Sequence, residues 1–229
     1  MKGIKLWLFV GFALASAAVF VRLGFWQISR LHERRAQNAL IISRLDSAEV
    51  DVNDIPRDTA LARFRLVRVA GIPDYDHELV FAARNYNGSP GVNFLTPVRF
   101  PGRDTAVVVD RGWVYTPDGS TIDHKPWRDR DSVFTGYVEE YPSTGGITYV
   151  GKPTIIARLS ADVVRKALPY PVAPVYVVAL NDSVKAMDRI VRLSVPPLDE
   201  GPHKDYAIQW FFFASVALFG AGYVIFGGR

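Results

Sequence analysis

The 229-residue chain contains no cysteine. It therefore has no disulfide framework, no thiolate metal site and no cysteine nucleophile. Histidine is scarce, with four residues: His32, His77, His124 and His203. The sequence also lacks an H-E-x-x-H motif, a G-x-S-x-G motif and a glycine-rich phosphate loop. Because so little catalytic chemistry is available, we expect a protein that is not an enzyme.

Basic residues are scattered along the chain, and no basic patch is interleaved with aromatic residues. The net charge is a modest +4. Nucleic acid is therefore not an expected partner. Arg30, Arg34 and Arg35 follow the first apolar run, where they are better placed to meet anionic lipid headgroups.

Two long stretches of the chain carry no formal charge. Tyr206 to Phe226 is a run of 21 such residues, and Leu6 to Val21 holds 16 residues that are all apolar or small. About 20 apolar residues are needed to cross the hydrocarbon core as a helix. We therefore expect transmembrane helices over residues 4–26 and 203–226, with an extramembrane domain at 27–202.

The first run has a second interpretation as a cleaved signal peptide. Residues 1–5 resemble a signal-peptide n-region, and Ala15-Ser16-Ala17 resembles an A-x-A cleavage site. The apolar run, however, continues to Trp26, a residue type that anchors helices at membrane interfaces. An uncleaved helix is the favoured interpretation.

The side of the membrane on which the domain lies is not decided by charge. Two spans place both termini on one side and the domain on the other. More Lys and Arg residues flank the spans on the domain side than on the terminal side. Long domains translocate largely regardless of charge, however, so this count does not fix the orientation.

The domain sequence is typical of antiparallel β structure with few helices. β-prone runs occur at residues 63–69, 79–83, 93–100, 105–109, 133–139, 175–179 and 190–195. An Asn-Gly turn signal lies in a loop at 85–91, and 115–131 is an expected exposed loop. Ser160–Leu168 predicts a capped helix, and 31–45 should continue the first span helically. The predicted fold is an α+β membrane protein whose two terminal helices flank a mainly antiparallel β domain with one or two helices.

Three polar positions in the domain are candidates for chemistry. The cluster Asp74, Asp76, His77 and Glu78 could form a metal or hydrolase site, but an acidic solvated turn is favoured. His124 is expected at the surface. Arg111 and Trp113 are interpreted as structural, the arginine pairing with carbonyls or an acid and the indole covering the core.

His203 is the candidate ligand of the membrane region. An imidazole at the end of a span can bind a metal or a metallated cofactor, although it can equally be an ordinary interfacial side chain. Helical spacing places it on one face with Tyr206, Ala207 and Trp210. On the first span, small residues share a face with Arg22 and predict close helix pairing: Gly11, Ala15 and Ala18.

Three short motifs resemble those of a known family. Leu23–Arg30 is similar to its L-G-x-W-Q-x-x-R. The run Val109–Val114, which Thr96-Pro97 precedes, is similar to V-N-R-G-W-V, with Asp110 in place of the usual Asn. His203–Phe211 resembles H-x-x-Y-A-x-x-W-F. By these motifs in this order, over residues 20 to 215, the chain resembles the Surfeit locus one family, assembly factors for cytochrome c oxidase.

The resemblance implies a function and a set of partners. It implies a membrane assembly factor that binds haem a transiently, or assists its insertion into subunit I of the oxidase, with haem a synthase as a further partner besides membrane lipid. The implied location is the cell inner membrane, or the mitochondrial inner membrane in a eukaryote, as a multi-pass protein whose domain faces the periplasm.

The resemblance also implies that a histidine of the second span binds the haem, and we expect the outer ends of the two spans to splay and leave a cleft for the macrocycle. His203 would bind the iron, beside Tyr206. Trp210 or Trp26 would lie against the macrocycle, and Arg22 or Arg30 would pair with its propionates. Two other functions remain open from the residues: a membrane-tethered periplasmic ligand-binding sensor or scaffold without haem, and a hydrolase using the Asp74–Glu78 cluster.

Overall fold

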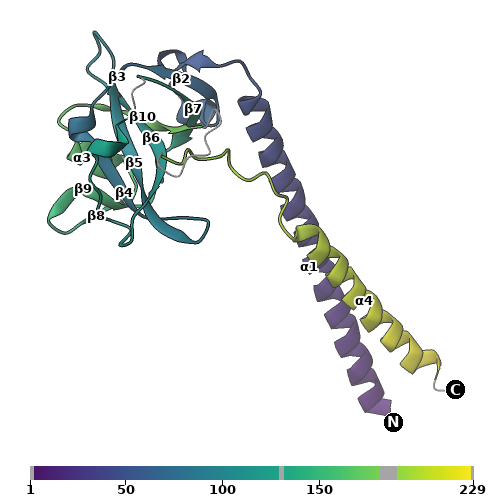
Figure 1. Cartoon of the computed structure of the whole chain (residues 1–229). Coiled ribbons are helices and arrows are strands. Elements are labelled where there is room, and N and C mark those ends of the chain that lie inside the picture. The colour runs from purple at the N-terminus through teal and green to yellow at the C-terminus, as the bar shows by residue number, and fades with distance from the viewer. Residues whose placement is uncertain (1–2, 129–131, 181–189, 228–229) are drawn as a thin grey trace. The chain divides into compact units, whose positions relative to one another are not determined.

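The computed structural model describes residues 3–128, 132–180 and 190–227 (Figure 1). These residues form two compact units. One comprises the chain up to Ile42 together with the chain from Pro197 onward, and the other is Ser43–Pro196. The first unit is helical and the second is built around a sheet.

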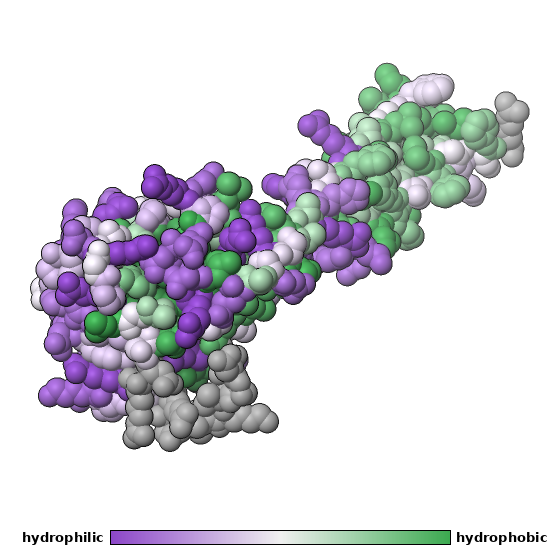
Figure 2. Space-filling model, turned by 90° about the horizontal axis from the view of Figure 1, so that it is seen from above, coloured by the Kyte–Doolittle hydropathy of each residue, from purple (hydrophilic) through white to green (hydrophobic). Residues whose placement is uncertain are grey.

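The helical unit is formed by α1 (Gly3–Leu45), whose last turn enters the second unit, and α4 (His203–Phe226). Both are long and apolar enough to cross a membrane, and only 17% and 11% of their most apolar windows are buried within the protein. Figure 2 shows hydrophobic residues over the visible face of this helix pair. A core helix of a soluble protein would be mostly buried, so the exposure favours membrane spans.

Helix α1 is about twice as long as a membrane span requires. Its 43 residues extend about 64 Å, against a hydrocarbon core about 30 Å thick. The predicted helical continuation over residues 31–45 is therefore confirmed. This outer part carries the charged residues that follow the apolar run, beginning at Arg30.

The two helices lie side by side (Figure 1). Small residues are prominent among the buried residues of both helices. On α4 the buried residues follow a seven-residue spacing, as the predicted face requires: Ala207, Ala214 and Ala221. On α1 the buried residues include Val10, Ala13, Ala17 and Gly24.

The predicted packing face of α1 is wrong. Gly11, Ala15, Ala18 and Arg22 do not lie among the buried residues of this helix. Helix α1 is apolar on every side in this region, so its small residues lie on more than one face and their spacing alone does not select one. Gly24 marks the true face, since a Cβ there would lie 2.7 Å from the ring of Phe211.

The second unit contains one mixed sheet whose strands follow the order β1-β2-β7-β10-β6-β5-β4-β9-β8, with β3 paired to β5. Most neighbours are antiparallel, while β1–β2, β10–β6 and β4–β9 are parallel. The strands are β1 (Val50–Asp51), β2 (Leu66–Ala70), β3 (Ile72–Pro73), β4 (Leu79–Tyr86), β5 (Ser89–Arg99), β6 (Ala106–Tyr115), β7 (Val133–Glu140), β8 (Ile147–Tyr149), β9 (Lys152–Arg158) and β10 (Val172–Ala179). The predicted α+β class is confirmed.

Most predicted strands are found, with two corrections. The run at 190–195 is not a strand; it makes isolated bridges from Val191 to Trp113 and from Leu193 to Leu180. The loop predicted at 85–91 is a two-residue turn, because Asn87 and Gly88 both adopt positive φ (50° and 83°) and let β4 and β5 pair up to the turn.

The helices of this unit are short. They are α2 (Thr59–Ala62) and α3 (Ala161–Ala167), with 3-10 turns η1 (Val52–Asp54), η2 (Tyr75–His77) and η3 (Lys125–Trp127). Ser160 caps α3 by accepting a hydrogen bond from the Val163 amide, as predicted. Val164 of α3 packs into a hydrophobic cluster with strand residues such as Leu79, Leu95 and Val108.

Candidate functional site

His203 is the first residue of α4 and follows a tight turn in the chain. Gly201 adopts a φ of +67°, a conformation that glycine reaches without steric cost. The Gly201 amide donates to the Asp199 carboxylate at 3.0 Å. This turn sets the direction in which the chain enters α4 and so places the imidazole.

The segment before the turn is tied to the outer part of α1. The buried Asn38 side chain donates through Nδ2 to the carbonyls of Leu198 and Asp199, at 2.9 and 3.1 Å. Arg35 forms a two-pronged ion pair with Glu200 at 2.7 and 2.8 Å. These contacts fix the start of α4 against α1. We call residues 198–200 the connector.

The imidazole itself contacts α1 through a polar side chain that our sequence analysis did not select. His203 Nδ1 lies 2.8 Å from Oε1 of Gln27, which is buried at 9% exposure. No hydrogen bond to Nε2 occurs among the described residues. The sequence signal was available, since Gln27 lies within the L-G-x-W-Q-x-x-R motif.

Aromatic rings close the helix pair next to this contact. Trp210 stacks on Phe20 with ring centroids 5.7 Å apart, and Phe25 meets Phe211 edge-on at 5.3 Å. The predicted splaying of the outer ends is therefore wrong. The helices contact each other here because ring stacking and the Gln27–His203 hydrogen bond add to the close packing at Gly24 and Ala207.

The other predicted site residues lie on the exterior of the helix pair. Trp26 is 51% exposed, and the Arg30 guanidinium lies over its ring at 5.8 Å. Arg30 also pairs with Glu33 at 2.7 Å, and Glu33 is within range of an electrostatic interaction with His203. Tyr206 is 47% exposed.

Arg22 is not brought to the site. It does not lie among the buried residues of α1, and at about 100° per residue it points about 140° around the helix from Gln27. The structure therefore places His203 and Trp210 on the pairing face and Arg30 beside Glu33 and Trp26, while Arg22 lies on another side of α1.

The donor set at His203 fits a haem iron. A neutral imidazole is an ordinary axial ligand. Ligating histidines usually donate their second ring N–H to an oxygen acceptor, and the Gln27 carbonyl supplies one on the Nδ1 side. No group of three or more His, Asp or Glu side chains suited to a metal ion occurs in the part of the chain that the structure describes.

The β domain contains a buried ionic network centred on Glu78. Arg111 Nη2 donates to Glu78 Oε2 at 2.5 Å, and both side chains have no exposed surface. Thr96 also donates to Glu78, and the Trp127 carbonyl accepts from Arg111 at 2.7 Å. The structural interpretation of Arg111 is confirmed, whereas the assignment of Glu78 to a solvated turn is wrong because this network encloses its carboxylate.

Two further predictions concern His124 and Trp113 of the β domain. His124 is only partly exposed, since its Nδ1 lies 3.2 Å from Glu78 Oε1 and its ring packs on Phe94, so its placement at the surface is half right. Trp113 is 8% exposed and packs beside Tyr86, as expected of an indole that covers the core.

The remaining residues of the acidic cluster do not converge. Asp74 accepts from the Tyr170 hydroxyl at 2.8 Å and pairs with His77 at 2.9 Å, whereas Asp76 pairs with Arg128 at 3.1 Å. Asp74 and His77 contact each other, whereas Asp76 faces Arg128 and Glu78 faces Arg111, so the four side chains do not meet at one point. This arrangement does not favour the hydrolase alternative.

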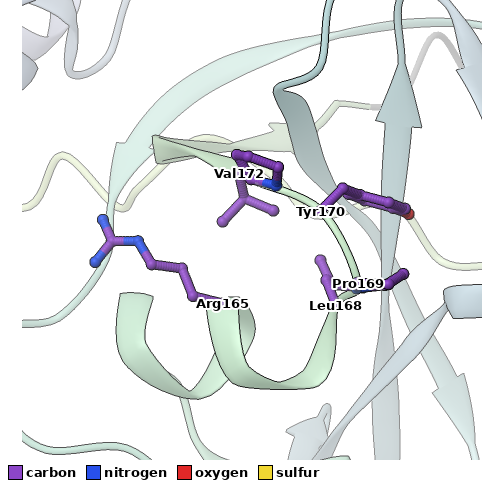
Figure 3. Close-up of a pocket in the computed structure, with 6 residues that line it drawn as sticks. Arg165, Leu168, Pro169, Tyr170 and Val172 are labelled. Carbon is purple, nitrogen blue, oxygen red and sulfur yellow. The ribbon is translucent and has the colours of Figure 1, made fainter.

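A hollow on the surface of the β domain lies beside the end of α3 (Figure 3). It has a volume of about 350 Å³, and Arg165 and Tyr170 stand on opposite sides of it. The other lining residues are apolar: Leu168, Pro169, Pro171 and Val172. A ligand-binding sensor needs convergent polar groups in its pocket, and this lining supplies few.

Together these features define a class: membrane-anchored β-domain proteins with a polar contact at the outer end of a helix pair. The sequence profile of the SURF1 family matches residues 14–215, and the chain belongs to this Surfeit locus one family.

Relatives from distant organisms cover nearly the same length. The chain is 24% identical to a SURF1-like protein of Rickettsia felis, over 86% of this chain and 88% of the relative. It is 26% identical to an uncharacterized SURF1-like protein of Mycobacterium bovis, over 89% and 77%. A SURF1-like protein of Drosophila melanogaster is 23% identical, over 91% and 74%.

Proposed function

We propose that this protein is a membrane-bound assembly factor that binds haem a while the haem is inserted into subunit I of cytochrome c oxidase. The SURF1 family is known for oxidase assembly. The observation that carries the haem proposal is the placement of His203. Its Nδ1 is held by a buried amide oxygen of α1, and its Nε2 has no protein hydrogen-bond partner among the described residues.

Haem a is cargo in this proposal, and its iron chemistry belongs to the oxidase that receives it. The protein supplies binding and orientation without turnover. His203 would hold the iron through Nε2, and Trp210 stabilises the helix pair by stacking on Phe20. Arg30 is the cation better placed for a propionate, since Arg22 points away from the side of α1 that carries Gln27. Trp26 and Tyr206, both exposed, are the rings available to the macrocycle.

The proposed setting is supported by membership of the SURF1 family and by the two apolar helices. Subunit I and haem a synthase are the expected partners, and lipid surrounds the two apolar helices. We place the protein in the cell inner membrane with its β domain in the periplasm, or in the mitochondrial inner membrane in a eukaryote. Two helices able to cross a membrane support the multi-pass arrangement.

The decisive test is the absorption spectrum of the full chain purified from cells that make haem a. The wild type should carry haem, and His203→Ala should lose it while the folded protein remains in the membrane. His32→Ala is the matched control, because His32 is an exposed histidine of the same helix pair. Arg30→Ala should lower haem occupancy and Arg22→Ala should not.

Two results contradict this proposal. A wild-type protein that never carries haem would leave an assembly role resting on protein contacts alone. Retention of full haem occupancy in His203→Ala, with loss in His32→Ala, would move the ligand to α1.

A further inference from the structure

We propose that Gln27 is a positioning residue that holds His203 in one tautomer, with the proton on Nδ1 and the lone pair of Nε2 presented outward to a ligand. The inference rests on the proposed function for its purpose, because the ligand is taken to be a haem iron. The tautomer itself is a property of the protein without haem and can be measured separately.

The location of Gln27 shows that its contact is not incidental. The side chain is buried on the packing stripe of α1, between Gly24 and Leu31. A buried amide in an apolar helix is costly unless it is hydrogen-bonded. The helix pair places one polar group opposite it, the His203 imidazole at 2.8 Å. The contact therefore satisfies the carbonyl oxygen of Gln27 and one ring nitrogen of His203.

The chemistry of the contact selects the tautomer. The atom of Gln27 that faces the imidazole is the carbonyl oxygen Oε1, which accepts hydrogen bonds and cannot donate. With Oε1 facing the ring, the hydrogen bond forms only when Nδ1 carries the proton. A neutral imidazole has a single N–H, so Nε2 is left with its lone pair. This is the form that a metal ion requires of a histidine bound through Nε2.

Gly201 leaves space at the other side of the ring. A Cβ at position 201 would lie 3.4 Å from Cδ2 and 3.5 Å from Nε2 of His203. Because glycine has no Cβ, the turn adds no side chain against this edge of the imidazole. Gln27 therefore holds the Nδ1 edge of the ring, while Gly201 leaves out the side-chain carbon that would contact the Nε2 edge.

The tautomer is measured by nitrogen NMR on the haem-free full chain in lipid nanodiscs. Histidine nitrogens are labelled, His203 is assigned with His203→Ala, and spectra are recorded at about pH 8, above the ordinary imidazole pKa. We expect the Nδ1–H form in the wild type and in Gln27→Glu, and a mixture of both tautomers in Gln27→Leu. The Nε2–H form in the wild type, or no change in Gln27→Leu, would overturn the inference.

The haem-loaded protein allows a second measurement, the reduction potential of the haem. This potential would not change in opposite directions in the two variants if Gln27 only contributed to packing. Gln27→Glu places a stronger acceptor on Nδ1–H and should lower the haem reduction potential, whereas Gln27→Leu removes the acceptor and should raise it. Loss of such a supporting hydrogen bond typically weakens metal binding about 10- to 100-fold, and we expect this of Gln27→Leu. Gln209→Leu, at an exposed glutamine of α4, is the matched control.

The outcomes separate this inference from the proposed function. If the wild type binds no haem, the proposed function fails, and the NMR spectra alone decide the role of Gln27. If haem binds through His203 but both Gln27 variants shift the potential in the same direction, the proposed function stands and the positioning role of Gln27 is wrong.

Discussion

Asp110 is a carboxyl group buried at the irregularity between β5 and β6. It accepts hydrogen bonds from Asn93 Nδ2 at 2.9 Å and from the Gly112 amide at 3.0 Å, and it is 4% exposed. Burial raises the pKa of Asp110 to about 6, against the lowering effect of these two hydrogen bonds. The family motif has an asparagine here, which offers the same shape without an ionisable group.

The raised pKa predicts that Asp110→Asn stabilises the protein in a pH-dependent way. The folded-state pKa of about 6 exceeds the ordinary value of 3.8. The contribution of protonated Asp110 to the free energy of unfolding is therefore fully present below pH 3.8. It is lost as the pH rises through the folded-state pKa of about 6. The free-energy advantage of Asp110→Asn should grow from near zero at about pH 4 to about 3 kcal/mol at neutral pH. Chemical denaturation at several pH values measures it.

Asp104→Asn is the matched control for this experiment, because Asp104 is exposed in the turn before β6. Its stability should follow the wild type at every pH. If Asp110→Asn is more stable than the wild type by the same free energy at every pH, packing and not ionisation accounts for the difference.

At the scale of elements, the connector is held to α1 by side chains whose loss has a local effect. Asn38→Leu keeps the volume of the side chain but removes two hydrogen bonds to backbone carbonyls, which costs about 1–3 kcal/mol. Amide hydrogen exchange over residues 199–206 should become faster. Gln37→Leu, at the exposed neighbouring position, should leave the exchange unchanged. Equal protection in Asn38→Leu would contradict the role of the connector contacts.

Element type was largely predictable, because β-branched runs and capping residues act locally. The strand at 133–139 and the Ser160 cap are examples. The run at 190–195 has the same composition but fails as a strand, because Val191 and Leu193 bridge to different parts of the sheet. Strand pairing depends on distant partners that local composition does not specify.

The candidate site was only partly predictable for the same reason. His203 was identifiable from its position at the end of an uncharged run. Gln27 was not selected, because its importance comes from a contact across the helix pair. The fully apolar character of α1 also hid which face packs. Glu78 was misassigned because an acidic residue beside Asp74 and Asp76 indicates solvent unless its buried partner, Arg111, is known.

At the scale of the whole molecule, the two apolar helices place both termini on one side of the membrane. The family resemblance predicts that this side is the cytoplasm and that residues from about 30 to 202 lie outside. Alkaline phosphatase, which is active only in the periplasm, should be inactive when fused after residue 229. It should be active when inserted at the β8–β9 turn, where Val150 is fully exposed. The reverse pattern of activities would overturn this orientation.

The hydrogen bond between Gln27 and His203 joins positions 176 residues apart in the chain. During synthesis α1 emerges first, and the whole β domain follows before His203 is made, because chains grow from the N-terminus. A truncated or unfinished molecule carries the glutamine without its histidine. Under the proposed function, a chain can therefore hold its cargo only after synthesis has passed the β domain and reached His203, and shorter nascent chains are kept from capturing a reactive macrocycle.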